Sequence, residues 1–434
     1  MKARLVFLLP LVFALAGCGA SRSLPDATVA SKADPRLIAR GAQLSAVGNC
    51  HGCHTRAGGD AYAGGVPLTS PYGTIYSTNI TPDRETGIGT WSQPAFARAM
   101  REGVRKDGAH LYPAFPYDRF TRTSDEDIEA LYAYFMSLPP VRYEPPANRL
   151  MIPFNVRAAL AIWKARHFTP ATPVRAVSGT PMQRGEYLVE GLGHCGSCHS
   201  PRTLLQAEDK RRLYDGGEAE GWYAYAINEK NAAPIPWDAV ALAHYLRHGW
   251  AEYHGIARGT MGLVTHELAA AAPEDIEAMA TYAMSLMKAP TAERVARGGE
   301  LVRDPKVEVP KGTTHPGARI YETTCRGCHQ AGREMPWQGM PLAWSIGLTG
   351  ESPRNLINVI LHGLPPASNG ETTPVMPGYA GALDEAQVEA LVTWMRAALT
   401  DRPPWTDLRK HIAKSRRMTS KTLMWPPGGT GSEP

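Results

Sequence analysis

Three copies of one short cysteine motif constrain this chain more than any other feature of its sequence. Each copy has two cysteines separated by two residues and followed at once by a histidine: Cys50–His54, Cys195–His199 and Cys325–His329. In this arrangement two thiols can form thioethers along one edge of a porphyrin, and the next residue can place its imidazole under the ring as an iron ligand. The motif therefore predicts three covalently attached c-type haems.

The residues that hold these haems follow from the motif. The predicted thioether cysteines and proximal iron ligands are Cys50, Cys53, Cys195, Cys198, Cys325 and Cys328, with His54, His199 and His329. A zinc site would pair two Cys-x-x-Cys units and would not need a histidine after each of them. A thioredoxin-like redox motif would need a βαβ pattern around it. The three independent units favour haem over both alternatives.

The sequence around each motif repeats as well. A glycine precedes each motif (Gly41, Gly185, Gly317), with an apolar residue three positions later. An amphipathic helix with i, i+3, i+4, i+7 spacing closes each repeat. Its apolar residues are Ile128, Leu131, Tyr132 and Phe135, then Ile276, Met279, Ala280 and Ala283, then Val388, Leu391, Val392 and Met395. Ser124 with Asp127, Pro273, and Asp384 with Gln387 predict the starts of these helices.

This organisation predicts an all-α chain of three tandem cytochrome c domains, since the motif period is too long for a solenoid. We expect each haem to supply much of a core that so few residues cannot build alone. Proline-rich stretches mark the joints. The expected boundaries are residues 36–142, 178–290 and 312–400, followed by a basic, proline-rich tail at 401–434.

The second axial ligand of each iron is expected from a loop just before the closing helix, where methionine would raise the reduction potential relative to histidine. Met261 and Met376 stand in that loop in the second and third repeats. Core packing is the alternative role for any methionine. The matching positions favour Met261 and Met376 as distal ligands.

The first repeat lacks a methionine in the corresponding window, Pro113–Pro116. Met100 is the first candidate for a replacement, and Met136 and His110 are weaker ones. Alternatively, the first iron is five-coordinate or binds water. These alternatives stay open from the sequence.

The N-terminus has the pattern of an export signal. Lys2 and Arg4 precede an apolar run, Leu5–Ala16, which is too short to span a bilayer as a mature helix. The next residues resemble a bacterial lipobox ending at Cys18, which predicts a signal peptide at 1–18, lipidation of Cys18 and attachment to the membrane through acyl chains. An ordinary cleaved signal peptide is the alternative. The net charge of +5 is small for a chain of 434 residues, so it does not indicate a nucleic-acid partner.

Several segments resemble the three-haem cytochrome c subunits of bacterial membrane-bound dehydrogenases. They are Asn79–Asp83, Gly87–Trp91, Leu111–Tyr117, Asp127 and Ala130–Tyr134. Many relatives have methionine at the position of Phe115. One branch of this family serves quinoprotein alcohol dehydrogenases, and another serves molybdenum hydroxylases that act on aldehydes or N-heterocycles. Phe115, Asp215–Tyr223 and Ile235–Trp237 look closer to the second branch.

The resemblance implies an electron-transfer subunit with three haem c groups on the periplasmic side of the bacterial cell membrane. Its partner would be a dehydrogenase subunit carrying molybdenum and iron–sulfur centres, or pyrroloquinoline quinone. A quinone or a terminal oxidase would accept the electrons. The sequence has no nucleophile–base pattern, phosphate loop, or flavin or nicotinamide fingerprint, so we expect the substrate chemistry on another chain. A peroxidase-like enzyme with an open first haem is the rival class, and a haem-based sensor would need a signalling domain.

Overall fold

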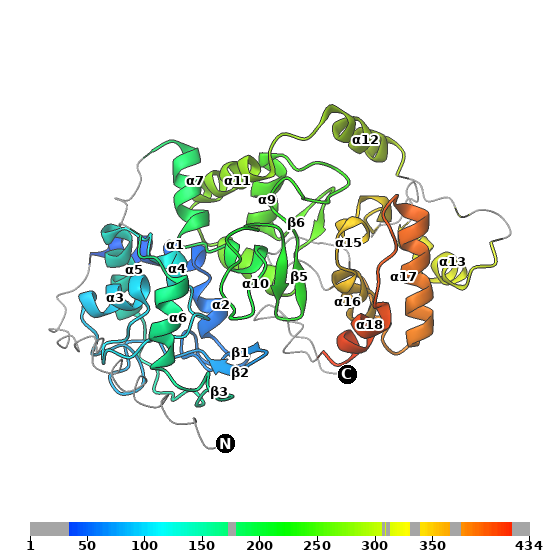
Figure 1. Ribbon diagram of the computed structural model, residues 1–434. Helices are drawn as coiled ribbons and strands as arrows, with labels where there is room; N and C mark the ends of the chain where they lie inside the picture. The colour runs from blue at the N-terminus through cyan, green and yellow to red at the C-terminus, as the bar shows by residue number, and fades with distance from the viewer. Residues whose placement is uncertain are drawn as a thin grey trace, which may run out of the picture. The chain divides into compact units, whose positions relative to one another are not determined.

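The computed structural model describes residues 34–171, 179–305, 309, 313–329, 339–364 and 375–418. These residues form two compact units. The first unit lies within Met1–Gly41 and Ala63–Ala176, and the second consists of Ala42–Tyr62 with Val177–Pro434. Both are mostly helical (Figure 1). Helix α1 (Pro35–Val47) begins in the first unit and ends in the second. Cys18 lies outside the described residues.

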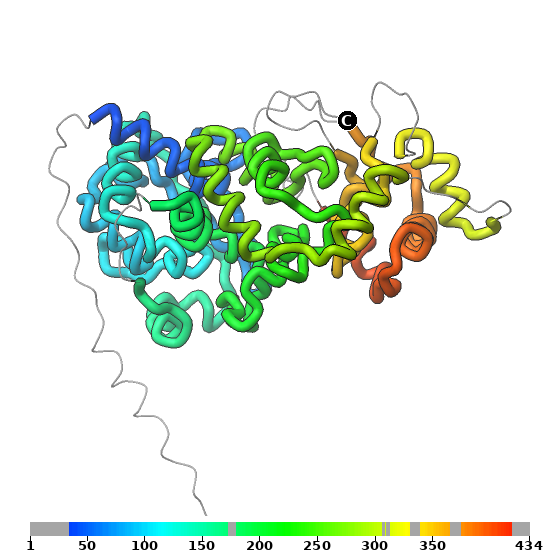
Figure 2. Tube along the Cα trace, turned by 90° about the horizontal axis from the view of Figure 1, so that it is seen from above, coloured from blue at the N-terminus to red at the C-terminus, as the bar shows by residue number. Residues whose placement is uncertain are grey.

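Short elements separated by loops make up both units. The first unit continues with β1 (Pro67–Ser70), β2 (Gly73–Tyr76), α3 (Gln93–Glu102), α4 (Tyr117–Phe120), α5 (Asp125–Ser137), β3 (Arg149–Leu150) and α6 (Ala159–His167). The second unit contains α2 (Cys50–His54), α7 (Pro181–Glu190), α8 (Gly196–His199), β4 (Gly217–Ala219), β5 (Trp222–Ala224), α9 (Ala239–His248), β6 (Trp250–Ala251), β7 (Gly255–Ile256), α10 (Thr260–Leu268), α11 (Pro273–Met287) and α12 (Ala292–Arg303). Its last part contains α13 (Pro316–Ile320), the π-helical turn η1 (Tyr321–Cys325), α14 (Arg326–His329), the 3-10 helix η2 (Leu342–Trp344), α15 (Ile346–Thr349), α16 (Arg354–His362), α17 (Glu385–Leu399) and α18 (Leu408–Arg416). In Figure 2 the second repeat is green and the third runs from yellow to red.

The three glycines before the motifs lie where the first helix of each repeat crosses the closing helix. A Cβ on Gly41 would overlap the carbonyl oxygen of Ala130, and one on Gly185 would overlap that of Ala278. Gly317 stands in the same relation to Ala390. The two helix backbones therefore approach so closely that the packing of each repeat requires glycine.

The closing helices α5, α11 and α17 confirm the expected pattern. Ser124 accepts the backbone N–H of Asp127 at the start of α5, and Asp384 with Gln387 forms a complete capping box on α17. Pro273 occupies the first turn of α11. Apolar residues of the three helices fill the cores, with exposures of 0% for Leu131, Ala280, Val388 and Val392.

Small antiparallel sheets accompany the helices. Strands β1, β2 and β3 form one sheet in that order, while β4–β5 and β6–β7 form two hairpins. These strands carry no strong signal in the sequence because each has only two to four residues. Alternation is not readable over so short a run.

Helix α18 lies in the segment that the sequence assigned to a basic tail. Its residues Leu408 and Ile412 are buried in the same core as α17. The ring Nε2 of His362 donates to the carbonyl of Ser415 at 3.0 Å. The guanidinium of Arg396 lies 4.0 Å from the centre of the Trp405 ring. The described part of the tail therefore packs against the third repeat.

Candidate haem sites

One large cavity in the second unit connects the second and third motifs. Its volume is about 1190 Å³, above the roughly 300–1,000 Å³ that is typical of a single small-ligand site. Most of its lining is apolar and aromatic. The predicted haem residues in this lining are Cys195, Cys198, His199, Met261, Cys325, Cys328, His329 and Met376. The structure thus brings together the residues that the sequence assigned to two haems.

The histidine of the second motif is prepared to bind a metal through Nε2. Its Nδ1 lies 2.7 Å from the carbonyl oxygen of Tyr225. Because a carbonyl can only accept, Nδ1 of His199 must donate, which leaves a lone pair on Nε2 of the neutral ring. Burial lowers the pKa of His199, although the hydrogen bond to Tyr225 opposes this shift. The ring is therefore held in the neutral form that coordinates metals.

The third motif repeats this arrangement with a different partner. Nδ1 of His329 donates to the carbonyl of Met340 over 2.8 Å. Burial lowers the pKa of His329, and the hydrogen bond to Met340 again raises it in part. The two histidines present the same free nitrogen, as a proximal haem ligand requires.

Among the described residues, the cysteines of the three motifs form no disulfides, so their sulfur atoms are available for thioether bonds. Burial raises the pKa of Cys50 to about 12 and that of Cys325 to about 11. Burial also raises the pKa of Cys198. Paired cysteines beside an apolar cavity and a histidine with a free Nε2 fit haem c. Across the residues that the structure describes, no three or more His, Cys, Asp or Glu side chains gather as the four ligands of a zinc site would.

The first motif lies close to the second. Burial raises the pKa of Cys53 to about 11, and Cys198 and Glu220 are near enough to raise it further electrostatically. On the other side, Nδ1 of His51 lies 3.0 Å from Oε1 of Glu267 on α10, the helix that carries Met261. The first attachment segment therefore contacts helix α10 of the second repeat.

The two expected distal methionines occupy different local structures. Met261 is the second residue of α10 and follows Gly259, which has a positive φ of 60°. Met376 lies in extended backbone and forms a two-way bridge with Leu364, through N–H to carbonyl hydrogen bonds of 3.0 and 2.9 Å. Both methionines line the cavity.

The candidates for the first iron lie in the first unit. Met100 is buried on α3, with 6% exposure, and Met136 is half-buried on α5. His110 has its Nδ1 3.4 Å from the ammonium group of Lys164. Since the ammonium group donates, Nε2 of a neutral His110 carries the proton, which disfavours this ring as a ligand through Nε2. Met100 as the distal ligand of the first haem stays a prediction.

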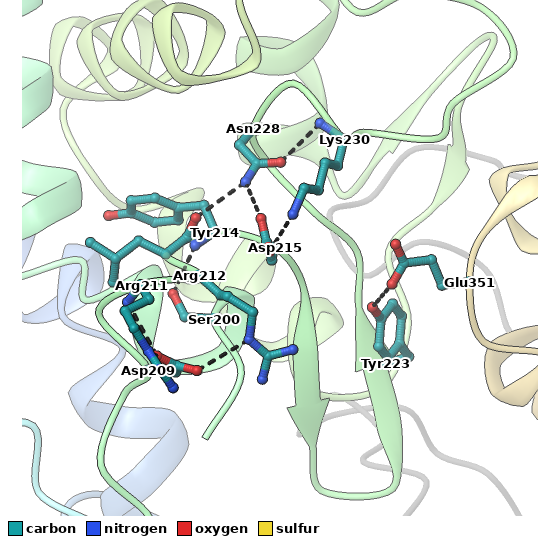
Figure 3. A network of polar contacts seen from close by, with 11 residues as sticks. Ser200, Asp209, Arg211, Arg212, Tyr214, Asp215, Tyr223, Asn228, Lys230 and Glu351 are labelled. Atoms are coloured by element: carbon teal, nitrogen blue, oxygen red, sulfur yellow. Dashed lines mark hydrogen bonds and ion pairs between the residues drawn. The ribbon is translucent and has the colours of Figure 1, made fainter. Parts of the chain in front are cut away.

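Loop contacts hold the second site in place (Figure 3). The Tyr214 backbone N–H donates to the hydroxyl of Ser200, directly after His199, at 2.9 Å. Asp215 accepts from Asn228 at 2.7 Å and from Lys230 at 2.6 Å. The sequence pointed to this region only through a family resemblance. It missed the Tyr225 and Met340 carbonyls, since a backbone acceptor leaves no mark in the sequence.

Paired cysteines followed by a histidine, two of these histidines with a free Nε2, and an apolar cavity shared by two motifs define a multihaem c-type cytochrome. Residues 38–139 match the family model for cytochrome c, and residues 312–395 match that for cytochrome C oxidase, cbb3-type, subunit III.

Proteins with similar sequences include the cytochrome c subunits of two dehydrogenases. The gluconate 2-dehydrogenase cytochrome c subunit of Pantoea cypripedii is 35% identical, over 89% of this chain and 91% of that protein. The alcohol dehydrogenase (quinone) cytochrome c subunit of Gluconobacter oxydans is 33% identical, over 89% of this chain and 84% of that protein. The chain belongs to this family of cytochrome c subunits of membrane-bound dehydrogenases, and it carries three covalently bound haem c groups.

A nicotinate dehydrogenase subunit of Pseudomonas putida is 42% identical, over 88% of this chain and 32% of that protein. The chain therefore spans about a third of the length of this relative. In the part of the chain that the structure describes, no helix is long and apolar enough to cross a membrane.

Proposed function

We propose that this protein relays electrons from a partner dehydrogenase to the respiratory chain through three haems arranged in series. Bound haem supplies the reversible one-electron chemistry of iron. The chain's own residues hold the three groups, orient their ligands and limit the access of water. The substrate is oxidised on the partner subunit, and a quinone or a terminal oxidase accepts the electrons.

The ligand assignments of this proposal rest on the geometry of the cavity. His199 and His329 serve as proximal ligands, because each ring has Nδ1 bound to a carbonyl and Nε2 free. Met261 and Met376 serve as distal ligands, because both line the same cavity. His54 serves as the proximal ligand of the first haem by analogy with the other repeats, and Met100 is the first candidate from the sequence for its distal ligand.

The series arrangement is the observation that carries the proposal. The first motif contacts the second repeat through His51 and Glu267. The second and third motifs share one cavity. A relay needs each group beside the next, whereas an enzyme with one reactive haem has no use for a continuous row.

The partner is best described as a molybdenum-dependent enzyme that oxidises an aldehyde or an N-heterocycle. The 42% identity to a nicotinate dehydrogenase subunit supports this branch. The alternative partner is a quinoprotein alcohol dehydrogenase, and the coverage of the alcohol dehydrogenase cytochrome c subunit, 84% of its length, favours that alternative.

We further propose that lipidated Cys18 anchors the protein on the periplasmic side of the membrane. The lipobox-like sequence supports this assignment, and two acyl chains would give stable attachment. Mass spectrometry of the mature N-terminus tests it, since a diacylated cysteine at position 18 is the expected first residue.

Purification of the native complex tests the choice of partner. Gentle solubilisation, followed by capture on this chain, should bring down a second protein whose cofactors can be assayed. Molybdenum with iron–sulfur centres would support the proposed branch, and pyrroloquinoline quinone without molybdenum would support the alternative. A chain that copurifies with no dehydrogenase would contradict the relay.

A peroxidase-like enzyme is the rival from another class, because Pro113–Pro116 contains no methionine. An open first iron should bind carbon monoxide when reduced and should turn over peroxide. Carbon monoxide binding without peroxide turnover would mark an open site without this activity, and the absence of binding would remove the rival.

A further inference from the structure

The side chain of Asn355, at the start of α16 in the third repeat, is bound to strand β5 of the second repeat. The Tyr223 backbone N–H donates to Oδ1 of Asn355 at 2.8 Å. In return, Nδ2 of Asn355 donates to the carbonyl of Tyr223, also at 2.8 Å. One amide side chain therefore satisfies both backbone groups of a strand residue.

The hairpin register explains why Tyr223 can accept this partner. Tyr223 stands opposite Glu218, between the Ala219–Trp222 and Gly217–Ala224 pairs. In an antiparallel pair, alternate residues turn their N–H and C=O groups away from the neighbouring strand. Asn355 thus occupies the place that a third strand would take. The hydroxyl of Tyr223 adds a bond of 3.1 Å to Glu351 (Figure 3).

The same strand leads directly to the partner of a haem ligand. Tyr225 lies two residues beyond Tyr223, and its carbonyl accepts Nδ1–H of His199 at 2.7 Å. Its ring packs against Gly350 so closely that a Cβ there would lie 2.9 Å from Cε1 of Tyr225. Burial raises the pKa of the Tyr225 hydroxyl to about 12, and a hydrogen bond with Asn355 opposes this shift.

Asn355 therefore holds the chain on both sides of this carbonyl. It binds the backbone of Tyr223, two residues earlier, and it forms a hydrogen bond with the hydroxyl of Tyr225 itself. We infer that Asn355 is a positioning residue for the second haem, through which the third repeat fixes the Tyr225 carbonyl and the orientation of His199. This inference rests on the proposed relay. Within that relay, the contact of Asn355 helps to set the reduction potential of the second haem.

The sign of the expected change in reduction potential follows from the hydrogen bond that His199 donates. A firm bond from Nδ1–H to a carbonyl makes the imidazole a stronger donor, which favours the oxidised iron. If Asn355 is lost and the carbonyl moves, this donation weakens. The reduction potential of the second haem should then rise.

The test compares Asn355→Leu with Glu218→Gln in the full-length, haem-loaded protein. Leucine keeps the approximate size of the side chain and removes its hydrogen bonds. The control acts at the same junction, since Glu218 pairs with Arg354 at 2.8 Å and its side chain is 64% exposed. Tyr225→Phe removes only the hydroxyl contact and serves as a second, milder variant.

Potentiometric titration followed by electron paramagnetic resonance gives the potential and ligand geometry of each haem. The signal of the second haem is identified by its loss in Cys195→Ser/Cys198→Ser. We expect Asn355→Leu to raise its ferrous-to-ferric ratio about tenfold at a fixed potential, which corresponds to about 59 mV for one electron. Tyr225→Phe should produce a smaller shift in the same direction, and Glu218→Gln should produce none.

Two different failures are distinguishable. If the wild-type protein titrates with three haems and neither variant shifts the second haem more than the control does, the inference is overturned and the relay stands. If the wild-type protein lacks three redox-active haems, the inference falls together with the relay.

Discussion

The second and third repeats carry the same motif, yet the chain reaches it by different routes. In the second repeat α7 ends at Glu190, and a turn leads to His194, which has a φ of 39° directly before Cys195. In the third repeat the chain stays helical and passes through the π-turn Tyr321–Cys325. Thr324 occupies the position of His194, and a β-branched residue resists a positive φ. The π-turn instead leads directly into Cys325, which lines the cavity.

The segments that carry the two proposed distal methionines also differ. Met261 is held by the first turn of a helix, whereas Met376 is held by two backbone hydrogen bonds to Leu364. The proximal carbonyls also differ in their distance along the chain, because Tyr225 lies 26 residues after His199 and Met340 lies 11 residues after His329. The longer loop of the second repeat contains the β4–β5 hairpin that meets the third repeat. In both repeats the motif fixes the chemistry, while the loops connect one site to the next.

Removal of one haem should have the largest effect on this comparison. Cys195→Ser/Cys198→Ser removes both thioethers of the second site. Because each of the three motifs binds one haem, the covalently bound haem should fall by about one third. The cavity joins the two sites, so the third haem should also change its potential. Pyridine haemochrome analysis measures the haem content, with Cys325→Ser/Cys328→Ser as the matched variant. Unchanged haem content in either variant would contradict the assignment.

The helix crossings should be nearly as sensitive. Gly185→Ala places a Cβ against the carbonyl of Ala278, and we expect a loss of about 2 kcal/mol in the free energy of unfolding because the backbones must separate. The control is Gly299→Ala on α12, where a Cβ would lie 3.6 Å from the Arg303 guanidinium. There, helix propensity predicts a gain of up to about 1 kcal/mol. Denaturant titration compares them, and equal effects would contradict the close crossing.

Exchange of the distal ligands should separate the two sites by potential. Met261→His and Met376→His should each lower the potential of one haem, because histidine favours oxidised iron more than methionine does. A tenfold change in the oxidised-to-reduced ratio corresponds to about 59 mV, and we expect at least this shift. Met340→Leu is the control, since Met340 serves the third site through its backbone carbonyl. If Met340→Leu shifted the reduction potential and Met376→His did not, Met340 rather than Met376 would be the distal ligand of the third haem.

Substitutions at the residue directly before each motif should have the smallest effect on stability. We expect this effect to have opposite signs in the second and third repeats. His194→Gly relieves a positive φ and removes the 2.9 Å contact of the imidazole Nδ1 with the Leu192 carbonyl. Because we expect the relief of strain to be the larger of the two effects, this variant should stabilise the protein by about 0.5 kcal/mol. Thr324→Gly loosens a helical position and should destabilise it by about 0.5 kcal/mol. Thermal unfolding of the haem-loaded variants measures both. The same sign in both variants would show that the two approaches do not differ as described.

The sequence predicted the parts of this molecule that depend on local pattern. The attachment motifs, the closing helices and their caps follow from residues within a few positions of one another, as with Ser124 and Asp127. The crossing glycines were visible as a repeat, although their contact with Ala130, Ala278 and Ala390 was not. The Tyr225 carbonyl and the Asn355 side chain escaped prediction because their partners lie far away along the chain. The two- to four-residue strands escaped it because they are too short to show alternation.

The most direct test of the series relay follows the haems of the native complex as the partner's substrate is added. In the wild-type complex all three haems should become reduced. In Cys195→Ser/Cys198→Ser, the account predicts that one remaining haem is reduced while the other stays oxidised, because the middle member of the row is missing. Reduction of both remaining haems at the wild-type rate would contradict a row in which the second haem connects the first to the third.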